Sequence, residues 1–115
     1  MKKIEASKWK WFGGAGHLCV GHSCRFHLCT QVGKYLVSTV GQYFPFGSEK
    51  MDTIGFDRLY ETMVFKAGPA CKANGCSCGM PDIDGSEIDF LPYNDAGSAT
   101  RGHLKLCKKW ADEPL

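Results

Sequence analysis

Five side chains in the second half of the chain have the chemistry of metal ligands. Cys71, Cys76 and Cys78 form a compact group of thiols, which we call the cysteine knuckle. His103 and Cys107 are four residues apart, so on a helix they lie on one face. Thiolates and imidazoles are the usual ligands of tetrahedral zinc. We therefore predict a zinc site that joins the knuckle to a C-terminal helix, with one thiol in excess. The alternative is that His103 and Cys107 only form the buried seam of that helix.

A second cluster of soft ligands lies earlier in the chain. Between residues 17 and 29 three histidines and three cysteines occur. Cys24, His27 and His22 are expected to approach one ion where a loop enters a strand, either as a second site or as part of the first. The alternatives are buried free thiols and surface histidines. The sequence is therefore compatible with one bound ion or with two. It is also compatible with a site of three protein ligands and one water molecule, which could catalyse hydrolysis.

The cysteine count and the N-terminus favour metal over disulfides. Seven cysteines leave one thiol unpaired in a fully oxidised scaffold. Glu5 and Lys8 interrupt any apolar export segment, and no apolar run approaches the roughly 18 residues that span a bilayer. We therefore expect a cytoplasmic protein without membrane contact, in a compartment where structural disulfides are rare.

The hydrophobic pattern predicts a small sheet followed by one helix. Apolar and polar residues alternate from Cys24, Gly33-Lys34 supplies a two-residue turn, and residues 35–40 continue as the second strand of a hairpin. The aromatic cluster Trp9, Trp11 and Phe12 predicts an early strand or an anchor packed on the core. Residues 59–65 predict a third strand of the sheet, ended by Gly68-Pro69, and residues 66–93 read as irregular.

The C-terminal segment has the signals of a helix. Asn94 or Asp95 can cap its N-terminus, and apolar or ligand residues then recur at spacings of three and four up to Trp110. Together these patterns predict one α+β domain over residues 1–115. It has a small antiparallel sheet, a cysteine-rich loop and one C-terminal helix, and it is stabilised by zinc.

The charge distribution is informative although the net charge is only +2. Lysine and arginine gather in residues 1–11 and 101–115, whereas residues 82–95 contain five acids and no base. This indicates either a solvated acidic loop or a bipolar surface that steers a charged partner. Basic ends with Trp9, Trp11 and Trp110 also allow nucleic-acid binding.

The patterns that indicate catalysis are weaker than the patterns of metal ligands described above. The carboxylates of residues 82–89 lack the lysine of a magnesium nuclease, and His22 or His27 would have to be the base of a histidine-metal nuclease. No cysteine is singled out as a nucleophile. Glu61 is expected on the exposed side of its strand.

Several segments are similar to a group of small bacteriophage proteins that has no assigned activity. They are Cys24–Thr30, Tyr35–Gly41, Tyr60–Phe65, the cysteine knuckle, Ile83–Glu87, Tyr93–Gly97 and Gly102-His103. The resemblance implies the cytosol of an infected bacterium, where small phage proteins bind host or phage proteins, sometimes to block a defence system. We therefore expect a zinc-stabilised protein-binding module. A metal-dependent nuclease and a nucleic-acid-binding zinc module are the alternatives.

Overall fold

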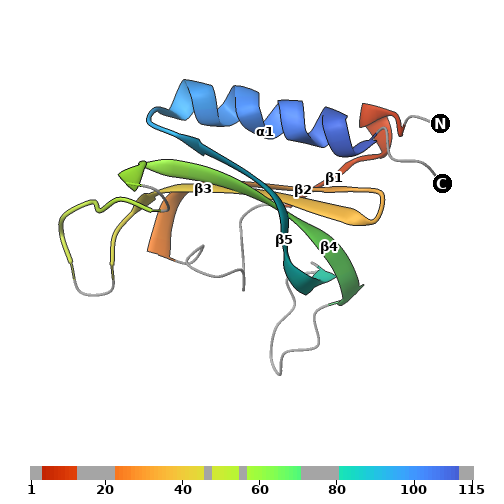
Figure 1. Cartoon of the computed structure of the whole chain (residues 1–115), viewed down its shortest axis with the longest axis horizontal. Coiled ribbons are helices and arrows are strands. Elements are labelled where there is room, and N and C mark those ends of the chain that lie inside the picture. The colour runs from red at the N-terminus through yellow and green to blue at the C-terminus, as the bar shows by residue number, and fades with distance from the viewer. Residues whose placement is uncertain (1–3, 13–22, 46–47, 55–56, 71–80, 112–115) are drawn as a thin grey trace.

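The protein is an antiparallel sheet with one helix across one face (Figure 1). The computed structural model describes residues 4–12, 23–45, 48–54, 57–70 and 81–111. Within them lie η1 (Ala6–Lys8), β1 (Lys10–Phe12), β2 (Cys24–Val32), β3 (Tyr35–Tyr43), β4 (Tyr60–Ala70), β5 (Pro81–Tyr93) and α1 (Ala96–Ala111). The strand order is β1-β2-β3-β4-β5, so each strand pairs with its neighbours in the sequence. The predicted antiparallel sheet with one C-terminal helix is confirmed.

The β2–β3 hairpin forms where the sequence places it. Val32 pairs with Tyr35 across the turn, and Gly33 has φ +60°. A positive φ at the first of two turn residues is the requirement of a type II′ turn, which favours glycine there. Lys10–Phe12 forms the predicted early strand, which pairs with β2.

The second half of the sheet is larger than predicted. β4 continues through Gly68 and Pro69 to Ala70, and residues 81–93 form a strand instead of an irregular segment. Residues 71–80 of that predicted irregular segment lie outside the described residues. The prediction was wrong because glycine, proline and aspartate weaken the strand pattern, yet sheet edges tolerate them. β5 is an edge strand, and β4 pairs with β3 only as far as Lys66.

β5 carries an insertion relative to β4. Val64 pairs with Asp89 and Lys66 with Asp84, so one β4 residue, Phe65, stands opposite four β5 residues. We call these four residues, 85 to 88, the β5 bulge. Gly85 has φ +85°, and all four residues are exposed. Because bulges bend the strand that carries them, β5 curves strongly along its length (Figure 1).

α1 begins and packs as its sequence predicts. The Asp95 carboxylate accepts a hydrogen bond from the Ser98 backbone N–H at 2.8 Å, which caps the first turn. The buried face of the helix includes Ala99, His103, Leu106 and Cys107. This face packs on apolar side chains of the sheet, among them Val32, Val37 and Val64.

A second apolar cluster occupies the opposite face of the sheet. Cys29, Leu36 and Val40 belong to it, because side chains alternate between the two faces along each strand. No helix in the described part of the chain is long and apolar enough to cross a membrane.

Candidate functional site

His103 lies completely buried between α1 and the sheet. Its Nδ1 atom is 2.7 Å from the Thr39 hydroxyl on β3, and its Nε2 atom is 2.8 Å from the Thr30 hydroxyl on β2. Both ring nitrogens are therefore hydrogen-bonded to threonine. A neutral imidazole has one donor and one acceptor nitrogen, and a hydroxyl can match either one.

The threonine hydroxyls extend this contact into a chain across the sheet. Thr39 and Thr62 are cross-strand partners with hydroxyl oxygens 2.6 Å apart, and Thr62 is 3.0 Å from the Tyr93 hydroxyl on β5. The chain therefore joins β2, β3, β4 and β5 to the helix. We call Thr30, Thr39, Thr62, Tyr93 and His103 the threonine–histidine network.

The threonine–histidine network has a structural role. Burial lowers the pKa of His103 to about 4, so the ring is neutral at pH 7. Because each ring nitrogen already has a hydrogen-bond partner, neither one faces a substrate or an ion in this arrangement. Buried polar groups that are fully paired fix how a helix sits on a sheet.

Cys107 lies one turn after His103 on the same buried face, as the spacing predicts. Burial raises the pKa of its thiol to about 12, and a hydrogen bond with Thr30 lowers it only in part. The thiol is therefore protonated at neutral pH and is a poor nucleophile in that form. Cys71, Cys76 and Cys78 lie outside the described residues, so a zinc site shared with His103 and Cys107 stays a prediction.

The second predicted group is only partly placed. His22 lies outside the described residues, while Cys24 and His27 lie on β2. Burial, and then the nearby charge of Glu61, raises the pKa of Cys24 to about 11. His27 is half-buried, and its Nδ1 atom has no hydrogen-bond partner among the described residues. Among those residues no three His, Cys, Asp or Glu side chains are grouped to hold a metal ion.

Two further side chains are buried on the face of the sheet opposite α1. Cys29 is fully buried, and burial raises the pKa of its thiol to about 12. Glu61 was expected on an exposed strand surface, but only 6% of it is exposed. That prediction was wrong because Glu61 pairs with Val40 and lies near Cys24, on the face that the second apolar cluster covers.

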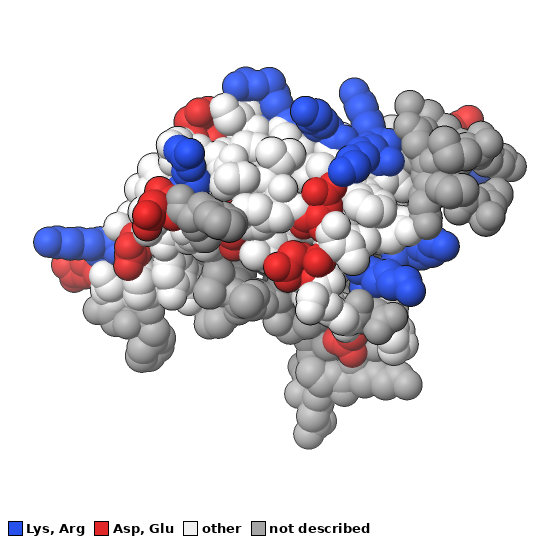
Figure 2. Space-filling model, in the orientation of Figure 1, with Lys and Arg blue, Asp and Glu red and all other residues white. Residues whose placement is uncertain are grey.

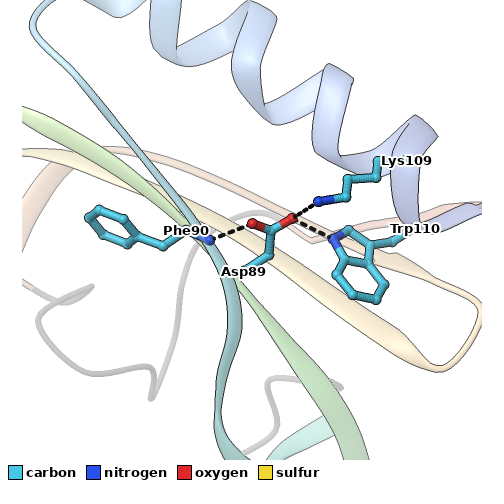
Figure 3. A network of polar contacts seen from close by, with 4 residues as sticks. All are labelled: Asp89, Phe90, Lys109 and Trp110. Atoms are coloured by element: carbon cyan, nitrogen blue, oxygen red, sulfur yellow. Dashed lines mark hydrogen bonds and ion pairs between the residues drawn. The ribbon is translucent and has the colours of Figure 1, made fainter.

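Asp89, in the acidic segment 82–95, forms hydrogen bonds with the helix. Asp89 accepts hydrogen bonds from the Lys109 ammonium at 2.7 Å, the Trp110 indole N–H at 3.0 Å and the Phe90 backbone N–H at 2.9 Å (Figure 3). Burial alone would raise the pKa of Asp89, but these hydrogen bonds outweigh it and lower the pKa. Asp89 therefore fixes the end of the β5 bulge to the last turn of α1.

The sequence did not reveal the threonine partners of His103. Thr30, Thr39 and Thr62 lie on three different strands and meet only when the strands pair in their observed register. The available signal was a threonine in each of three strand segments, which is common in strands for other reasons. Strand register, rather than residue type, brings them together.

Comparisons of this chain with protein-family models, with curated proteins and with solved structures found no match.

Proposed function

We propose that this chain is a protein-binding module without chemistry of its own, and that the β5 bulge is its recognition element. The observation that carries the proposal is the insertion of four exposed residues opposite Phe65. Ile88 in this bulge is 44% exposed, and Glu87 beside it is exposed as well. An isoleucine displayed beside a carboxylate fits an apolar pocket with a basic rim on a partner protein.

Rigid anchoring of the bulge supports this proposal. On one side Asp89 pairs with Val64 of β4 and binds Lys109 and Trp110 of α1, and on the other side Asp84 pairs with Lys66. A recognition loop held at both ends loses little conformational freedom on binding, which favours affinity. In the threonine–histidine network both ring nitrogens of His103 have threonine partners, so this buried histidine is not placed for catalysis.

The biological setting of the proposal comes from the resemblance to small phage proteins. In that setting the module works in the bacterial cytosol and its partner is a host or phage protein. We also propose a structural zinc ion at the cysteine knuckle, because three closely spaced thiols are typical of such sites. Elemental analysis of the purified chain should then give about one zinc per molecule, and Cys76→Ser should remove it.

The binding proposal can be tested by site-specific cross-linking followed by affinity measurement. A photoreactive amino acid at Ser86, expressed in bacterial cells, should give one discrete product, whose partner is identified by mass spectrometry and purified. Ile88→Ala should weaken binding of that partner at least tenfold in calorimetry. Met51→Ala is the matched control, because Met51 is also 44% exposed and lies outside the bulge. Equal affinities of the two variants would refute the proposed role of the bulge.

A further inference from the structure

The outward face of α1 is strongly basic. Between Ala96 and Ala111 the helix has Arg101, Lys105, Lys108 and Lys109 and no acid. Arg101, Lys105 and Lys108 are exposed and follow one another at i, i+4 and i+7, which places them about 6 Å and about 4.5 Å apart along the axis. Figure 2 shows lysine and arginine gathered along the upper side of the molecule, where Figure 1 places α1.

Two of these cations have no ion-pair partner among the described residues. Lys109 is paired with Asp89, and Arg101 lies near Asp95. No carboxylate of the described residues pairs with Lys105 or Lys108. Within the described residues, no ion pair therefore neutralises these two charges.

An exposed aromatic ring lies beside this helix. Trp11 is 51% exposed, the most exposed large apolar side chain of the described residues. Its backbone pairs with Thr30 of β2, and its ring lies 5.5 Å from the His103 ring, measured between centroids. Trp11 is thus held against the helix on one side while half of its surface remains in solvent.

Apolar contact and positive charge meet at this place. Leu104 follows His103 on α1 and is 38% exposed, so it lies between the Trp11 side of the helix and Lys105. We call Trp11, Arg101, Leu104, Lys105 and Lys108 the tryptophan–lysine surface.

We propose that the tryptophan–lysine surface binds single-stranded nucleic acid without sequence preference. Lysine and arginine contact successive phosphates, and an unstacked base stacks on the exposed side of Trp11. A duplex is a poorer ligand, because its bases are already stacked on one another. α1 is also badly placed to enter the groove of a duplex, because it lies flat against the sheet and has the acidic Asp95 at its N-terminus. This inference is independent of the proposed protein-binding function, which rests on residues 85 to 88.

Fluorescence anisotropy of a labelled 15-nucleotide oligo-dT with the full chain tests this inference. Binding is expected at 25 mM NaCl and should weaken as salt rises, with a slope of log K against log salt of about −0.7 for each phosphate contact. Trp11→Ala should reduce affinity at least fivefold, and Trp11→Phe should retain most of it, because a phenyl ring can still stack. Lys105→Glu with Lys108→Glu should reduce affinity and also make the salt slope shallower.

The controls separate this surface from a general effect of charge. Lys50→Glu reverses an exposed charge in the β3–β4 connection, and it should leave the affinity within twofold of the original. Circular dichroism and melting temperature show which variants keep the fold. Absence of binding at 25 mM NaCl would overturn the proposal. Three other results would also overturn it. They are an affinity for a 15-base-pair duplex equal to that for oligo-dT, a loss of affinity with Lys50→Glu equal to that of the double lysine variant, and an unchanged affinity of a folded Trp11→Ala variant.

Discussion

At the scale of single residues, His103 shows why a sequence leaves two interpretations open. A histidine and a cysteine four residues apart on a helix have the same pattern whether they hold an ion or face a core. The residues that hydrogen-bond His103 are Thr30 and Thr39, which are 73 and 64 positions away. The sequence therefore predicted that His103 and Cys107 share a face, but the partners of His103 depend on strand register.

The neutral state of His103 predicts a pH-dependent stability. Its pKa is about 4 in the folded chain and 6.5 in the reference state, so only the unfolded chain takes up this proton between those values. Stability should be unaffected above pH 6.5 and should fall by about 3 kcal/mol as the pH decreases from 6.5 to 4. Urea unfolding at pH 7, 5.5 and 4.5 measures this loss.

His103→Gln is the control for this prediction. Glutamine offers a donor and an acceptor to the threonines but does not titrate, so its free energy of unfolding should change less over the same range. The paired Asp89 does not interfere, because its lowered pKa keeps its stabilising effect intact until the pH falls below 3.8. Parallel pH profiles of the two proteins would show that His103 does not cause the loss.

At the scale of elements, regular patterns were predicted and interrupted ones were not. The hairpin of β2 and β3 has strict alternation and a turn glycine, and α1 has a cap and one apolar face, so both follow from local signals. β5 was missed because the β5 bulge breaks its alternation after four residues and because acids and prolines lower its strand propensity. Its pairing with β4 is a tertiary effect that no local window contains.

The contact between α1 and β5 predicts a difference between two glycines of the helix. A Cβ atom on Gly102 would overlap the Tyr93 phenol, whereas one on Gly97 would meet only the flexible ends of Arg101 and Asp95, at 3.3 Å. Gly102→Ala should therefore lower the free energy of unfolding by about 1–3 kcal/mol, since overpacking outweighs the gain in helix propensity. Gly97→Ala should leave stability unchanged or raise it by up to about 1 kcal/mol. Urea unfolding of both variants checks this, and equal stabilities would contradict the close packing of Tyr93 on α1.

At the scale of the whole molecule, charge and packing are organised by the same topology. A meander with one helix places the basic helix on one side and leaves β5 as an acidic edge strand. The sequence indicated both charge clusters, but not that one lies on a helix face and the other on a strand. The helix is held by buried contacts with inner strands and by the threonine–histidine network.

These contacts predict that the helix stays on the sheet when metal is removed. Val37, Val64 and Leu106 are at most 2% exposed, and burying each contributes about 1.5–3 kcal/mol without an ion. After treatment with a chelator and loss of zinc verified by elemental analysis, amide protons of α1 and β3 should remain protected in hydrogen exchange. The melting temperature should fall without loss of cooperative unfolding. Cys76→Ser, which lacks a knuckle thiol, should behave like the chelated protein. Loss of protection in α1 on chelation would contradict this prediction and would favour an ion shared by His103, Cys107 and the cysteine knuckle.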